Sequence, residues 1–248
     1  MPRIPELTAR TDGGNAIFQV SGDTSATVAS APIPRYEPQW AALRAGFQQW
    51  AAGAAKDATR YQRTAWDEAQ RDTVANYIAS QWRAMQAAVQ AGAREDAKRA
   101  AQPIPDGAHG PEDRAHLRAL SVPDQIRAVA AGDDDMLAAL LHVGAARWNW
   151  PVEAWSAAVE RWQVRQVLAR TGIPAQFAIQ PSVDDVAPIG VDWKAAETAA
   201  RAEIARDGEH VAQTARAKRV LTDTVAAVAA GCGMTAAEAL ALLMGEEL

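Results

Sequence analysis

Tryptophan occurs nine times in a chain whose most frequent residue is alanine, and it outnumbers phenylalanine and tyrosine combined. Large apolar side chains recur every three or four residues, first at Trp40, Leu43, Phe47 and Trp50, and again at Ile78, Trp82, Met85 and Val89. This spacing predicts amphipathic helices that bury one face. We therefore expect an all-α fold of long amphipathic helices and a small helical bundle, preceded by an extended N-terminal arm.

Composition narrows the class of protein. The net charge of −5 and the pI near 5.4 argue against a general nucleic-acid-binding protein, which usually has a basic face. Cys232 is the only cysteine, so an intramolecular disulfide is excluded. No apolar run reaches the roughly 18–20 residues of a membrane span, and the first residues lack the apolar core of a signal peptide. We expect a soluble protein that is made in the cytoplasm.

Residues 1–38 differ from the rest of the chain. They contain five prolines, the pair Gly13-Gly14 and the Ser/Thr-rich stretch VSGDTSATVAS. Proline removes backbone donors and disfavours helix before it. We predict an extended arm that becomes ordered against a partner, with a short strand as one option at residues 16–20. The alternative is a terminus without fixed structure.

Residues 39–102 contain no proline and are rich in helix formers. The pattern predicts a long helical segment, either one rod or a hairpin of two helices. Gly46, Gly53 and Gly92 are the positions at which we expect a bend or a break. The sequence leaves the choice between rod and hairpin open.

The remaining chain alternates between breaker-rich and helical segments. Residues 103–118 and 173–191 each contain three prolines, which predicts a linker and an extended linker. Residues 119–172 predict a small bundle of three short helices, with Trp148 and Trp150 at its corner and Gly172 as the final cap. Residues 192–248 predict C-terminal helices, with Gly208 as an interruption and a capping box from Thr235 to Glu238.

The sequence offers no recognisable catalytic set or cofactor motif. His109 and His116 lie in a Gly/Pro-rich stretch without metal-ligand spacing. The acidic run at residues 133–135 lacks the spacing of a calcium loop and suits a helix N-terminus. We therefore predict an absence of enzymatic activity and assign no catalytic, cofactor or metal residues.

A helix–turn–helix could be imagined across residues 225–243, next to a basic cluster formed by Arg206, Arg216, Lys218 and Arg219. Its second helix carries Glu238 and no basic residue, whereas reading DNA requires Lys or Arg on that face. We do not expect sequence-specific nucleic-acid binding.

Four tryptophans are candidate interface residues. Few other large side chains surround them in the sequence, and a buried tryptophan often anchors a protein–protein interface. We expect some of them to contact another subunit of a homo-oligomer, and the set is Trp40, Trp50, Trp66 and Trp82.

Three segments resemble virion structural proteins of tailed bacteriophages, particularly the internal or ejection proteins packaged in the head. They are the opening MPRIPELTAR with its Pro-rich step APIPRYEP, the helix FQQWAAGAAKDATRYQRTAWDEAQ, and LSVPDQIRAVAAGDDDMLAALLHVGAARWNWPVEAW. The resemblance implies a non-enzymatic virion subunit, internal or near the portal, that assembles with copies of itself and with other virion proteins. Alternatives are a cytoplasmic helical adaptor or phage assembly factor, and a DNA-binding regulator that uses the C-terminal helices.

Overall fold

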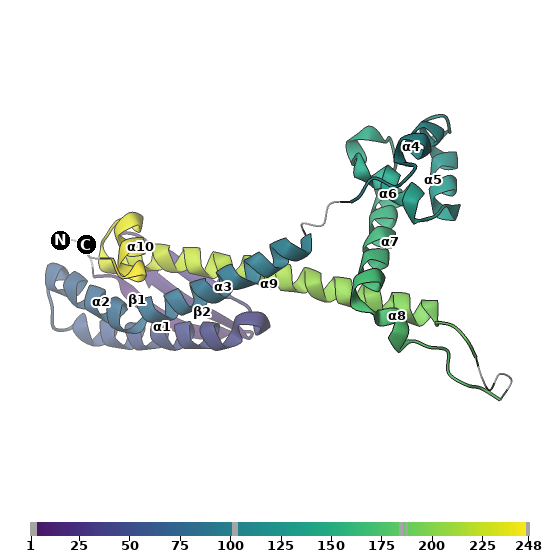
Figure 1. The fold of residues 1–248 in the computed structure, drawn as a ribbon. Coiled ribbons are helices and arrows are strands. Elements are labelled where there is room, and N and C mark those ends of the chain that lie inside the picture. The colour runs from purple at the N-terminus through teal and green to yellow at the C-terminus, as the bar shows by residue number, and fades with distance from the viewer. Residues whose placement is uncertain (1–3, 101–103, 184–185, 187, 247–248) are drawn as a thin grey trace. The chain divides into compact units, whose positions relative to one another are not determined.

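The structure is a computed structural model that describes residues 4–100, 104–183, 186 and 188–246 (Figure 1). The chain divides into two compact units. Unit 1 combines Met1–Lys98 with Glu209–Leu248, and unit 2 is Arg99–Gly208. The long helix α9 (Trp193–Cys232) contributes to both units.

Unit 1 begins with a three-stranded antiparallel sheet, so the fold is mostly helical but not all-α. The strands are β1 (Glu6–Asp12), β2 (Asn15–Ser21) and β3 (Ala26–Ser30). This sheet occupies the residues for which we predicted an extended arm. Alternate residues Phe18 and Val20 of β2 are buried, as is Val28 opposite Phe18 on β3. An arm was therefore the wrong expectation, because these strands bury one face against the chain's own helices.

The first two strands are joined by a two-residue turn. Asp12 pairs with Asn15, and Gly13 and Gly14 between them have φ angles of +54° and +84°. Positive φ at both central positions is what a two-residue hairpin of twisted strands requires, and glycine adopts it without steric cost. The expected strand at residues 16–20 lies within β2.

Residues 37–100 form three helices in place of one rod. After η1 (Pro34–Tyr36), these helices are α1 (Glu37–Asp57), α2 (Arg63–Tyr77) and α3 (Ala79–Ala100). The chain leaves the helical path at residues 58–62, and α2 packs against α1. Helices α1 and α2 therefore form a helical hairpin.

The three glycines at which we expected a break lie inside helices. A Cβ at Gly46 would lie 2.7 Å from the backbone oxygen of Tyr77. This glycine therefore lets α1 approach the end of α2 closely, and it does not interrupt its own helix.

Unit 2 includes helices over residues 119–172, where we predicted a small bundle, and extends beyond these residues at both ends. Its elements are α4 (Gly110–Arg118), α5 (Val122–Ala131), α6 (Asp134–His142), η2 (Ala145–Arg147), α7 (Val152–Thr171), α8 (Ile173–Gln176) and the first part of α9. The helix α4 lies in the segment predicted as a linker, with Pro111 in its first turn, where a missing N–H costs little. Gly172 ends α7 with a φ of +64°, which confirms the predicted cap.

In the C-terminal helices the predicted capping box is confirmed, whereas the predicted interruption at Gly208 is wrong. Helix α9 continues through Gly208 without interruption. The backbone N of Ala195 donates to Asp192 at 3.0 Å, which caps its start. Helix α10 (Ala236–Met244) opens with the capping box between Thr235 and Glu238 that the sequence predicts.

Candidate protein interaction sites

All four tryptophans that we singled out as interface candidates lie in the core of unit 1. Trp50 and Trp66 are 0% exposed, Trp40 is 1% exposed and Trp82 is 3% exposed. A second subunit would have to open the fold to reach these rings. The structure therefore corrects their location from a surface position to the interior of a single chain.

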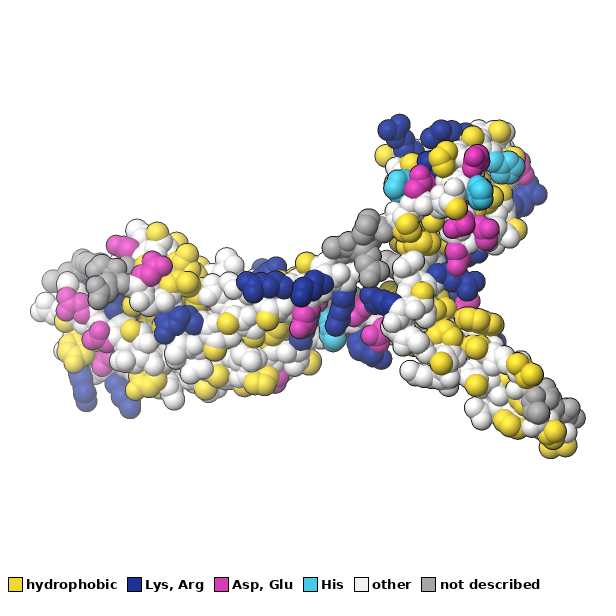
Figure 2. All heavy atoms as spheres, in the orientation of Figure 1, with side chains coloured by type: hydrophobic (Ala, Val, Ile, Leu, Met, Phe, Trp, Pro, Cys, Tyr) yellow, Lys and Arg dark blue, Asp and Glu magenta, His cyan; other side chains and the backbone are white. Residues whose placement is uncertain are grey.

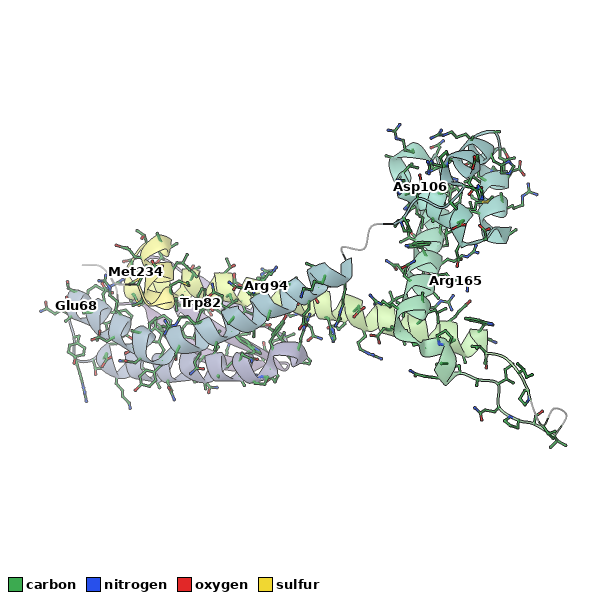
Figure 3. All side chains as sticks on the ribbon, in the orientation of Figure 1. Glu68, Trp82, Arg94, Asp106, Arg165 and Met234 are labelled. Atoms are coloured by element: carbon green, nitrogen blue, oxygen red, sulfur yellow. The ribbon has the colours of Figure 1, made fainter. Side chains whose placement is uncertain are left out.

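The sheet supplies the large partners that the helices lack. Phe18 on β2 stacks on Phe47 with ring centroids 4.6 Å apart and on Trp50 at 5.2 Å. The indole N–H of Trp50 donates to Gln70 on α2 at 3.0 Å. Trp82, labelled on α3 in Figure 3, donates to the backbone oxygen of Leu221 on α9 at 3.1 Å.

The tryptophans of unit 2 divide into core and surface positions. Trp148 is buried and donates to the backbone oxygen of Leu140, and Trp150 packs beside it in the same cluster, as predicted. Trp193, at the start of α9, is 52% exposed.

A buried ionic network joins the sheet-to-helix connection of unit 1 to α3 and α9. The Arg35 guanidinium donates to Asp96 at 2.8 Å and to the hydroxyl of Thr214 at 2.9 Å. The side chains of Arg35 and Asp96 are only 13% and 12% exposed. Tyr36 also contacts the Thr214 hydroxyl at 2.9 Å. These contacts fix three segments that are far apart in sequence, and they constitute a structural anchor.

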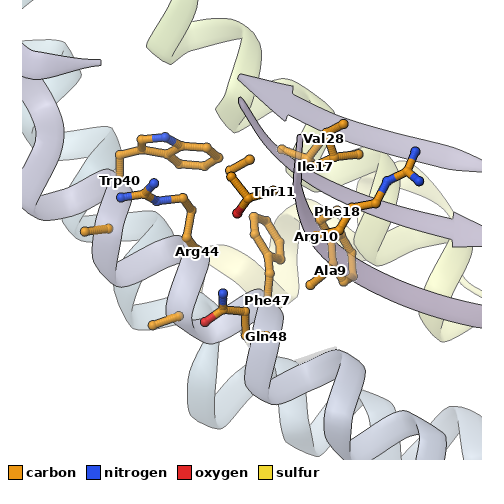
Figure 4. A pocket seen from close by; sticks show the side chains of 13 residues that line it. Ala9, Arg10, Thr11, Ile17, Phe18, Val28, Trp40, Arg44, Phe47 and Gln48 are labelled. Atoms are coloured by element: carbon orange, nitrogen blue, oxygen red, sulfur yellow. The ribbon is translucent and has the colours of Figure 1, made fainter. Parts of the chain in front are cut away.

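A hollow of about 220 Å³ lies between the β1–β2 hairpin and α1 (Figure 4). We call it the sheet–helix hollow. Its floor includes the buried rings of Phe18, Trp40 and Phe47. Alanines at four wall positions leave the space open, namely Ala9 and Ala16 from the strands and Ala41 and Ala45 from α1.

Two arginines line the same hollow. Arg44 pairs with Glu37 and lies over the Trp40 ring, 5.6 Å from its centroid. Arg10 is exposed, and within the described part of the chain it has no ion-pair partner. The hollow therefore has a positively charged edge above aromatic rings that are almost fully buried.

Residues 177–193 of unit 2, called the apolar loop here, leave the helices and return to them. The loop is closed at its base by hydrogen bonds from Ile179 to the backbone oxygen of Gly190 and from Asp192 to that of Phe177. Val183 and Ile189 are 98% exposed and Val186 is 79% exposed. Figure 2 shows hydrophobic side chains gathered along this loop. Loops usually expose polar residues, so these exposed aliphatic side chains make the loop the candidate interaction site of unit 2.

The polar residues that the sequence offered as candidate ligands make local contacts within unit 2. His109 Nδ1 lies 3.3 Å from a carboxylate oxygen of Glu112, but the described residues contain no group of three or more potential ligands that could hold a metal ion. Arg114 holds Asp106 through a hydrogen bond that lowers the pKa of that carboxyl group. Asp133 accepts a hydrogen bond from the backbone N of Met136 and caps α6. Burial raises the pKa of the Cys232 thiol to about 12.

The predicted basic cluster is partly neutralised. Arg206 pairs with Glu203, and Arg219 pairs with Asp223 at 3.7 Å. Helices α9 and α10 meet at 109°, an angle within the range of helix–turn–helix motifs. Helix α10 carries Glu238 and no Lys or Arg, so it lacks the charge that contacts with DNA phosphates need.

Within the described residues, no individual helix has the length and apolar composition to cross a membrane, although the bent pair of α9 and α10 meets that criterion when taken together. Comparison of the chain with protein-family models, curated proteins and solved structures finds no match.

Proposed function

We infer that this chain is a non-enzymatic structural subunit that assembles with copies of itself, in the manner of the internal or portal-proximal virion proteins of tailed bacteriophages. The observation that carries the inference is the apolar loop. Val183, Val186 and Ile189 are almost fully exposed although each would gain about 1.5–3 kcal/mol from burial. A second copy of the chain that covers them would recover this free energy.

The two-unit organisation supports the same proposal. The apolar loop belongs to unit 2, whereas unit 1 has a hydrophobic core of its own that includes all four candidate tryptophans. Subunit contacts through the loop therefore leave both cores intact. The phage-like segments described above point to the virion as the place of assembly, with other virion proteins as further partners.

The proposal is tested by the solution mass of the purified chain, measured by light scattering after size exclusion over a range of concentrations. We expect a defined multiple of 26.4 kDa. Replacing Val183, Val186 and Ile189 together by serine is expected to shift the mass to that of a single chain. Val152→Ser is the matched control, because Val152 is 76% exposed on α7 but lies outside the loop.

A single-chain mass at every concentration would contradict self-assembly. Detection of the chain in purified phage particles would support the virion role, whereas its presence only in infected-cell extracts would favour an assembly factor. Binding to DNA that weakens with added salt would favour the regulator instead.

A further inference from the structure

Helix α10 is apolar on the side that faces away from the core of unit 1. Ala239 and Leu243 are 0% exposed and belong to that core, whereas Leu240 and Met244 are 42% and 40% exposed. Glu238 is the one polar residue of the helix, and the capping box uses it. Figure 2 shows hydrophobic side chains at the end of unit 1 that carries this helix. A helix that is apolar all round is ordinarily covered on every side.

Small and large side chains alternate on the outward face of α10. Four residues at helical spacing make up this outward stripe, namely Ala237, Leu240, Ala241 and Met244. When two such helices pack antiparallel, residues at equal distances from the centre of the pair lie level with each other. A centre between residues 240 and 241 sets Leu240 opposite Ala241 of the other helix, and Met244 opposite its Ala237. Each large side chain then meets a small one, which lets the two surfaces interdigitate.

The same register brings opposite charges together at both ends of the pair. Glu246 follows α10, is exposed, and forms no ion pair with another described residue. In the antiparallel pair it lies level with Thr235 of the other copy, at the positive N-terminal end of that helix. Arg71 of α2 lies near this end, because hydrogen bonds from Thr235 and then the charge of Arg71 lower the pKa of Glu238. The end that receives Glu246 is therefore positively charged.

We propose that α10 of one copy packs antiparallel against α10 of a second copy about a two-fold axis, with the large side chains of each outward stripe on the alanines of the other. This proposal rests on the self-assembly proposed above and adds a contact in unit 1 to that of the apolar loop. The contact is isologous, because both copies use the same patch. A nine-residue helix covers only part of the roughly 1,600 Å² of a stable interface. The helix pair therefore strengthens an assembly that the loop holds together and does not replace it.

Disulfide cross-linking at the centre of the pair tests this contact. Ala241→Cys places one thiol per chain beside the two-fold axis, next to the thiol of the other copy. Oxidised glutathione accepts the electrons as the two thiols form a disulfide. The native Cys232 does not compete because it is buried, with a pKa raised to about 12 by desolvation.

Ala87→Cys is the matched control, because Ala87 is an exposed alanine on α3 of the same unit. We expect the Ala241→Cys chain to form a covalent dimer at least about tenfold faster than this control, since pairing raises the local concentration of the second thiol. The midpoint of urea unfolding, measured on each variant, verifies that the compared chains are folded.

Substitutions in the outward stripe test its part in the contact. Leu240→Ser together with Met244→Ser, added to the Ala241→Cys chain, should slow cross-linking to the control rate. Val211→Ser should leave the rate unchanged, because Val211 is 53% exposed on α9 but lies outside the stripe.

The charge at the end of α10 gives a second, independent test. Glu246→Arg should slow cross-linking of the Ala241→Cys chain by about threefold, because it brings a cation to the positive end of the other helix. Glu6→Arg makes the same change of charge on an exposed position of β1 and should have no effect. An equal effect of the two substitutions would overturn the antiparallel register.

The outcomes separate this proposal from the one on which it rests. A multimeric mass with Ala241→Cys cross-linking no faster than the Ala87→Cys control overturns the helix pairing and leaves self-assembly in place. Sedimentation of the chain with phosphatidylcholine vesicles, lost on Leu240→Ser with Met244→Ser, would show that a lipid surface covers the stripe, and this also overturns the pairing. A single-chain mass at all concentrations, with no cross-linked dimer, overturns both proposals.

Discussion

At the scale of single residues, glycines in α9 serve two different purposes. A Cβ at Gly231 would lie 2.7 Å from Cζ2 of the buried Trp50 ring, whereas a Cβ at Gly208 would meet nothing within 4 Å. Gly231→Ala should lower the free energy of unfolding, because overpacking against a fixed ring costs about 1–3 kcal/mol. Gly208→Ala should raise it by about 0.5–1 kcal/mol, because alanine favours the helix. Urea denaturation of both variants checks the signs, and a stabilising Gly231→Ala would contradict the packing.

The ionic anchor gives a second prediction at this scale. Asp96 and Glu95 are neighbours that both contact Arg35, but their side chains are 12% and 64% exposed. Asp96→Asn removes the charge that balances a largely buried guanidinium and should cost on the order of 3 kcal/mol. Glu95→Gln should cost less than about 1 kcal/mol, since water screens an exposed pair. Equal losses in the denaturation midpoint would show that the network is not the anchor described here.

At the scale of elements, the N-terminal sheet forms part of the core. Phe18 is 3% exposed and stacks on Phe47 and Trp50. Phe18→Ala should therefore destabilise the chain by about 3–5 kcal/mol. Thr8→Ala, on an exposed position of β1, should stay within about 0.5 kcal/mol of the parent. If Phe18→Ala leaves the free energy of unfolding unchanged in thermal or urea denaturation, the N-terminal sheet is not part of the core.

At the scale of the whole molecule, the two units contain separate apolar clusters. Leu137 is 0% exposed in unit 2, so Leu137→Ala should cost that unit about 2–5 kcal/mol. Native-state hydrogen exchange should show faster exchange for the amides of α6 and α7 and little change for those of α1. A parallel loss of protection in α1 would show that the units unfold as one.

Local signals read directly from the sequence were the most dependable. The helical spacing of the tryptophans, the cap at Gly172 and the capping box at Thr235 each depend on residues within a turn or two, and the structure confirms them. The pair Gly13-Gly14 was interpreted only as a feature of an irregular arm, and of the flanking strands only residues 16–20 were considered as an option. The break after Asp57 has no glycine or proline to mark it.

The sequence by itself determined that the chain is mostly helical, because helical spacing and caps are local properties of neighbouring residues. Only the tertiary structure decided where the tryptophans go. Trp50 is buried because Phe18 of β2 stacks on its ring and Gln70 of α2 accepts its N–H. The spacing of residues within one helix does not reveal partners that lie on other elements. The tertiary structure also decided which apolar residues of unit 2 stay outside its core: Val183 and Ile189 are exposed because no other described part of that unit covers them.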